Sequence, residues 1–118
     1  NTETWVNDII DGRLRKARIY LEKMPIEQLN KDEKGKLYLG ILHLLDVNGD
    51  LEQSINLLEE LRVANSNYYP RGSSYLITAL VLNGKVDRAR ELYEEDKAKN
   101  GLSDEALAPN ILNRINSN

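Results

Sequence analysis

The chain of 118 residues contains no cysteine, no phenylalanine and a single histidine. The lack of cysteine excludes disulfide bonds and thiolate metal sites, and it leaves the redox state of the compartment undetermined. A single histidine also excludes a metal centre built from several imidazoles. We therefore expect neither a metal nor a cofactor.

A long apolar segment is missing as well. The longest apolar stretch is interrupted by His43 and Asp46, and it falls short of the roughly 20 residues that cross a bilayer. The net charge of −3 comes from mixed signs rather than blocks, without the basic stripe that is typical of a nucleic-acid-binding protein. We expect a soluble protein, cytoplasmic or periplasmic, and do not expect a nucleic-acid partner.

The sequence begins at Asn1 rather than at methionine, without a basic and then apolar leader. We therefore expect either a processed mature chain or a piece of a longer protein. The length predicts one domain, residues 1–118, with a single core. Leucine and isoleucine must carry that core, because the chain has one tryptophan and one methionine beside six tyrosines.

One six-residue phrase occurs three times, starting at Gly12, Gly49 and Gly84. It reads glycine, polar, aliphatic, two polar residues and a small residue. The small residues are Ala17, Ser54 and Ala89. The starts lie 37 residues apart (12 to 49) and 35 residues apart (49 to 84). A repeat of this length is typical of stacked helical hairpins, in which no unit buries its apolar face alone.

The pattern predicts three hairpins and a C-terminal cap, over residues 1–24, 31–64, 70–98 and 103–116. In the first hairpin, a helix over residues 2–10 is expected to end at Gly12, and a second helix is expected to run from Arg13 to Pro25. In the cap, Pro109 predicts either a kink or two short helical pieces.

The middle hairpin has the clearest local signals. Asn30 and Glu33 have the spacing of a capping box, which predicts a helix start. The helix that includes residues 37–45 is apolar over most of its circumference, so we expect neighbours on more than one side. An asparagine precedes both Gly49 and Gly84, which predicts equivalent turns.

The hairpins resemble those of the tetratricopeptide-repeat (TPR) superfamily, whose unit is a helix-turn-helix of about 34 residues. The phrase is similar to the family's turn glycine and to the small residue of its second helix. The large residue one turn later is matched by Leu21, Leu58 and Tyr93. The resemblance covers residues 1–98 and is weaker in the first helices, where Leu42 and Ile77 replace an expected glycine and Ser73 an expected aromatic residue. It implies an all-α fold, an α-α superhelix of about three hairpins with a C-terminal capping helix.

In this family the first helices line a concave face that holds an extended peptide or a helix. The resemblance therefore implies a non-enzymatic adaptor or scaffold that binds a protein or peptide partner within a larger assembly. The implied binding residues are Lys36, Leu39, His43, Asp46, Arg71, Ser74, Tyr75 and Thr78. One TPR subgroup clamps carboxylates, but only Arg71 has suitable chemistry here, so we do not expect a clamp.

His43 and Asp46 stand three residues apart on one helix and share a face. They would suit a general base with its orienting acid, or half of a metal site. No nucleophile or oxyanion stabiliser accompanies them, so we favour a polar groove position or a solvated pair. No catalytic residue and no metal ligand is assigned.

Two further clusters have two interpretations each. The densest basic run suits an anionic partner, but a solvated outer face is favoured. It consists of Arg13, Arg15, Lys16 and Arg18. Three tyrosines near Pro70 suit a binding surface, but packing between repeats is favoured. They are Tyr68, Tyr69 and Tyr75. The acidic residues 94–96 are expected to be exposed.

Two other functions stay open at this level. The third phrase is similar to the pentatricopeptide cousins of this fold, which bind single-stranded RNA one base per unit, and three units would read about three bases. The chain also suits a helical appendage of a larger enzyme. Self-association is a further alternative, because a short helical array has exposed ends.

Overall fold

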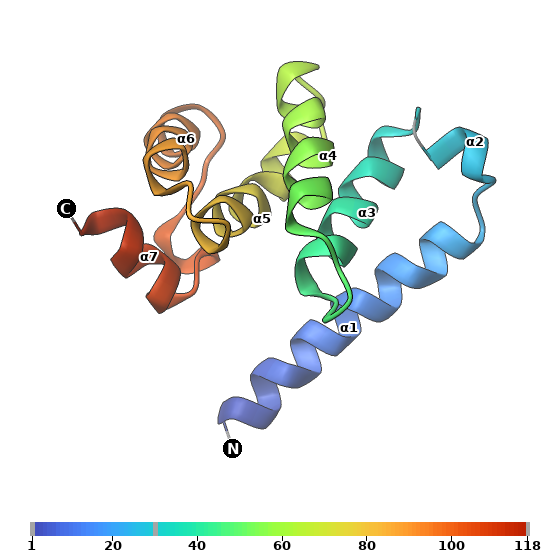
Figure 1. Ribbon diagram of the computed structural model, residues 1–118, viewed down its shortest axis with the longest axis horizontal. Coiled ribbons are helices and arrows are strands. Elements are labelled where there is room, and N and C mark those ends of the chain that lie inside the picture. Colours follow the sequence, from blue (N-terminus) through green and yellow to red (C-terminus); the bar gives the residue numbers. More distant parts are fainter. Residues whose placement is uncertain (1, 30, 118) are drawn as a thin grey trace.

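The computed structural model describes the backbone of residues 2–29 and 31–117, and the side chains of residues 12–25, 27–29 and 31–117. All regular structure in this part of the chain is helical, as predicted (Figure 1). The elements are α1 (Thr2–Glu22), α2 (Ile26–Leu29), α3 (Glu33–Leu45), α4 (Leu51–Val63), α5 (Tyr69–Leu82), α6 (Val86–Lys99), the 3-10 turn η1 (Asp104–Ala106) and α7 (Pro109–Asn116).

Two helical hairpins form the centre of the molecule. Short turns join α3 to α4 and α5 to α6, and α4 packs against α5, so the hairpins stand side by side (Figure 1). Helix α1 packs on α3 at one end, and α7 packs on α5 and α6 at the other. Helix α3 thus contacts α1, α4 and α5, which explains why it is apolar on more than one side.

The predicted hairpin at the start of the chain does not form. Helix α1 continues through Gly12, where the sequence predicted a turn, so that prediction is wrong. Gly49 must be glycine because a Cβ there would lie 2.0 Å from the His43 carbonyl oxygen, and Gly84 has a φ of +79°. Gly12 meets neither condition, and one glycine costs a helix only about 1 kcal/mol.

The last position of the repeated phrase behaves alike in all three copies. Ala17, Ser54 and Ala89 are fully buried. In α4, the Ser54 hydroxyl also donates a 2.7 Å hydrogen bond to the carbonyl oxygen of Gly40 in α3. A small side chain is needed at this position because a neighbouring helix lies close to it.

Glycines allow the same close approach around Leu58 of α4. A Cβ on Gly40 would lie 2.9 Å from the Leu58 Cγ. A Cβ on Gly72 of α5 would lie 3.1 Å from both Leu58 and Leu37. Leu58 is fully buried between these helices, so the backbones of α3 and α5 both approach α4 at positions without a side chain.

Asp96 of α6 is only 1% exposed, so the prediction that residues 94–96 are exposed is wrong at this position. One carboxylate oxygen accepts hydrogen bonds from the Tyr69 hydroxyl at 2.7 Å and the Ser73 hydroxyl at 2.6 Å, and the other accepts one from the Asn100 amide at 2.8 Å. Burial and this carboxylate raise the pKa of Tyr69 above its ordinary range. Asp96 therefore ties α6 to α5.

Polar contacts also hold the two ends of the array. Asp32 is the N-cap of α3 and accepts from the Gly35 N–H and the Tyr20 hydroxyl of α1; Asn30, favoured for this role by the sequence, lies outside the described residues. Burial and Asp32 raise the pKa of Tyr20 to about 12.

The C-terminal end of the array consists of η1 and α7, which are the two short helical pieces expected around Pro109. The Arg90 guanidinium donates to two carbonyl oxygens at the end of α7, those of Ile115 and Ser117.

The same substitution at two helical glycines is expected to change stability in opposite directions. Gly12→Ala should raise the free energy of unfolding by about 0.5–1 kcal/mol, because alanine favours the helix and, beyond the helix's own backbone and the chain neighbours, no described atom lies within 4 Å of the new Cβ. Gly40→Ala should lower it by about 1–3 kcal/mol, because the methyl group overpacks against Leu58. Urea unfolding of both variants tests this, and shifts in the same direction would contradict it.

Removal of the Asp96 carboxylate is expected to be strongly destabilising. Asp96→Ala leaves the buried hydroxyls of Tyr69 and Ser73 without their acceptor, at about 1–3 kcal/mol for each unsatisfied group. Asp96→Asn keeps an oxygen that can accept from both, so its loss should be smaller. Urea midpoints rank the two variants. An Asp96→Ala protein as stable as the parent would show that this network does not hold α6.

Candidate functional site

A groove of about 190 Å³ lies where α1, α3 and α5 meet. Its lining residues come from all three helices and combine three cations, two phenols and two aliphatic side chains. We call them the basic groove: Arg13 and Lys16 of α1, Leu37, Tyr38 and Ile41 of α3, and Arg71 and Tyr75 of α5. Residues three or four apart share one face of a helix, as do Arg13 and Lys16, Arg71 and Tyr75, and Ile41 with both Leu37 and Tyr38.

The floor of the basic groove is part of the hydrophobic core. Leu37, Tyr38 and Ile41 are all buried, and they belong to the same apolar cluster as Leu58. The tilted ring of Tyr20 lies beside Tyr38, with centroids 5.0 Å apart. Because these side chains are fixed by packing, the floor is formed in the unbound protein.

The rim of the basic groove is positively charged. None of its seven described lining residues is acidic, and no described carboxylate forms an ion pair with Arg13, Lys16 or Arg71. The Arg13 guanidinium lies 5.8 Å from the centroid of the Tyr75 ring, a cation–π contact. Lys34 adds a further cation beside Tyr38, 5.9 Å from its centroid.

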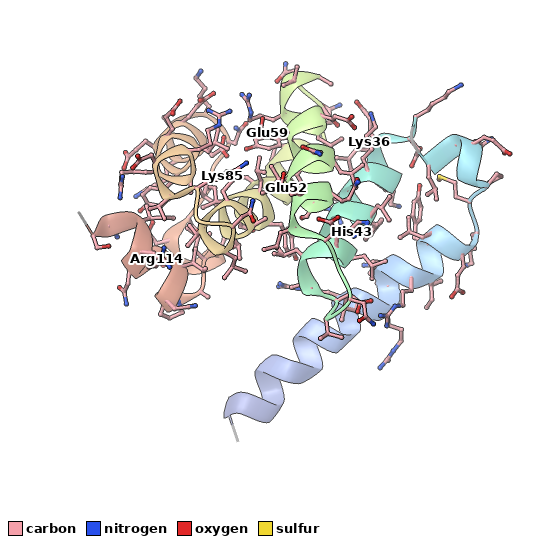
Figure 2. The ribbon with its side chains drawn as sticks, viewed as in Figure 1. Lys36, His43, Glu52, Glu59, Lys85 and Arg114 are labelled. Carbon is pink, nitrogen blue, oxygen red and sulfur yellow. The ribbon has the colours of Figure 1, made fainter. Side chains whose placement is uncertain are left out.

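Only two of the eight residues implied by the resemblance lie in the basic groove, Arg71 and Tyr75. Lys36 extends instead toward α4 and pairs with Glu60 at 3.5 Å (Figure 2). The Thr78 hydroxyl donates to the Ser74 carbonyl oxygen at 2.7 Å, within α5. Leu39 is half-buried. The binding role of these residues stays a prediction, and the structure does not gather them in one place.

The remaining two, His43 and Asp46, brace the turn between α3 and α4. The His43 Nδ1 accepts a 3.2 Å hydrogen bond from the Asp50 N–H. Asp46 accepts from the Asn48 N–H at 3.1 Å and pairs with Arg18 of α1. Both side chains thus accept from backbone N–H groups of the turn, and neither lies in the basic groove.

The basic run splits between two faces of α1. Arg13 and Lys16 turn into the basic groove, whereas Arg18 pairs with Asp46 and Arg15 lies on the outer surface beside Ile19. All four side chains are exposed, as the favoured interpretation of a solvated face predicts. Only the packing of α1 on α3 shows that Arg13 and Lys16 also line the basic groove.

Comparison with protein-family models, curated proteins and solved structures gave no match. The site is therefore interpreted from its own geometry. Within residues 2–29 and 31–117, no helix is both long and apolar enough to cross a membrane. No group of three side chains suited to a metal ion occurs among the described residues.

Asp46 is expected to stabilise the fold only above a certain pH. The Asn48 N–H and the Arg18 guanidinium hold the pKa of Asp46 below its ordinary value. Because the pKa is lower in the folded than in the unfolded chain, the stabilisation is present above pH about 4 and is lost as the pH falls through the lowered pKa.

Arg18→Gln should raise the pKa of Asp46 but leave it below the ordinary value, since the Asn48 N–H still donates. Titration of the carboxyl carbon by NMR measures both values. An identical pKa in the variant would show that Arg18 does not pair with Asp46 in solution.

Proposed function

We propose that this chain is a short TPR-like helical scaffold without catalytic activity, and that it binds a segment of a partner protein in the basic groove. The observation that carries the proposal is the meeting of three helices around an apolar floor with a polar rim. Such a site buries the side chains of a bound segment at its centre and leaves hydrogen bonding and charge to the edge, as in ordinary protein interfaces.

Three features support the TPR-like interpretation. The hairpins α3–α4 and α5–α6 follow one another with the same turn residues, Asn48 with Gly49 and Asn83 with Gly84. The small residue of the phrase is buried in α1, α4 and α6 alike. In a TPR-like arrangement, α1 therefore corresponds to the second helix of a hairpin, and α3 and α5 correspond to the first helices of the next two hairpins. In that family the first helices line the binding face.

The chemistry of the lining residues supports binding rather than catalysis. They offer guanidinium, ammonium, phenol and aliphatic groups. A hydrolytic or transfer reaction needs a positioned nucleophile or general base, and the lining includes no carboxylate, imidazole or aliphatic hydroxyl. We further propose that the scaffold acts within a larger assembly. The basic groove occupies one side of the helical array, so its other surfaces are available for contacts with further proteins.

Peptide selection with mapping by NMR tests the proposal. Peptides that bind the intact chain are selected from a random display library and titrated into the ¹⁵N-labelled protein. Amide shifts should concentrate on the basic groove, because binding excludes water from its floor. Tyr75→Ala should weaken binding by about tenfold or more, as expected for a central aromatic contact.

The matched control is Val63→Ala, which truncates a side chain that is 74% exposed on α4, away from the basic groove. It should leave the affinity unchanged. Because Tyr75 packs against the core cluster, Tyr75→Ala is expected to lower the urea midpoint, and far-UV circular dichroism without urea checks that both variants are folded. A library without any enriched peptide, or shifts that map to another face, would refute the proposed function.

A further inference from the structure

We infer that the segment held in the basic groove is acidic and carries an aliphatic side chain. Its carboxylates face Arg13, Lys16 and Arg71, and its aliphatic side chain contacts Leu37 and Ile41. The inference rests on the proposed function and names the chemistry of the partner.

The cations of the basic groove differ from those on the α4 and α6 side of the molecule. On the α4 and α6 side, cations have acidic partners: Figure 2 shows Glu52 and Lys85 beside one another, and their charged atoms are 3.9 Å apart. Glu59 pairs with both Arg62 at 2.9 Å and Arg88 at 3.3 Å. The three cations of the basic groove have no described carboxylate partner. Their mutual repulsion is relieved when a ligand supplies the carboxylates.

The basic groove is small. A volume of about 190 Å³ is below the roughly 300–1,000 Å³ of ordinary small-molecule and cofactor sites. It suits one side chain of a longer segment, with the rest of the segment lying across the rim. Because the floor is formed by Leu37, Tyr38 and Ile41, it is mainly apolar, and we expect that side chain to be aliphatic.

The basic groove suits an acidic peptide better than a single-stranded nucleic acid. Base stacking needs an open aromatic face, but Tyr38 is only 7% exposed and Arg13 lies over the ring of Tyr75. The chain as a whole carries a net charge of −3, which repels a long polyanion at a distance. A short peptide with a few carboxylates is attracted by the positive rim and, because it is short, is repelled little by the net charge of the chain.

The composition of the selected peptides is the primary readout. Peptides enriched on the intact chain should carry two or more aspartates or glutamates next to a leucine, isoleucine, valine or methionine. Raising the NaCl concentration from about 50 to about 500 mM should weaken the binding of the synthesised peptide by about tenfold, because exposed charge pairs are screened. Replacing its acids with the matching amides should have a similar effect.

Charge reversal in the protein tests the assignment of the residues. Arg71→Glu and Lys16→Glu should each weaken the acidic peptide by about tenfold or more. Arg114→Glu is the matched control, since Arg114 is exposed on α7 at the opposite end of the array (Figure 2), and it should leave the affinity nearly unchanged. A peptide with lysines in place of the acids should bind the Arg71→Glu protein better than the parent, which a purely structural role of Arg71 would not produce.

The outcomes separate this inference from the proposed function. Neutral or basic peptides that bind in the basic groove would overturn the inference and leave the scaffold proposal standing. The absence of any peptide bound in the basic groove would refute the scaffold proposal itself. Tighter binding of an oligouridylate than of the acidic peptide, lost in Arg71→Glu, would overturn the inference in favour of nucleic acid.

Discussion

Leu58 of α4 lies between two glycines, Gly40 of α3 and Gly72 of α5, and this contact sets the spacing of three helices. A side chain at either glycine would push a helix away from α4, because close-packed interiors have little room for an extra methyl group. The hydrogen bond from Ser54 to the Gly40 carbonyl oxygen lies on the same face. The packing of the two hairpins against one another depends on this cluster.

The basic groove is a consequence of that spacing. The Leu37 side chain lies against Gly72 and also lines the floor of the groove, so the core contact that joins α3 to α5 is continuous with the site. A floor held in this way needs no rearrangement to receive a side chain, which reduces the entropy lost on binding. Stability and the proposed binding therefore depend on the same residues at the floor.

Helix α1 brings two of those cations, and polar contacts hold it in place. Tyr20 donates to Asp32 at the start of α3, and Arg18 pairs with Asp46 at its end, so α1 is fixed at both ends of its neighbour. These contacts keep Arg13 and Lys16 turned toward α5. Asp46, which the sequence offered as a partner of His43, thus helps to hold α1 in place.

The sequence by itself determined the helices of the two central hairpins and the small residue in each second helix, because hydrophobic periodicity acts over a few residues. The predicted equivalence of the two asparagine-glycine turns is wrong: α3 ends four residues before Gly49 and α5 two residues before Gly84, and of these two glycines only Gly84 has a positive φ. Local signals did not determine that Gly12 lies within a helix or that Asp96 is buried, since both depend on neighbours distant in the chain. The same holds for the basic groove. Residues 13, 16, 38, 41, 71 and 75 meet only because Leu58 and its glycines hold α3 and α5 together and α1 packs across them, and no spacing within one segment contains that information.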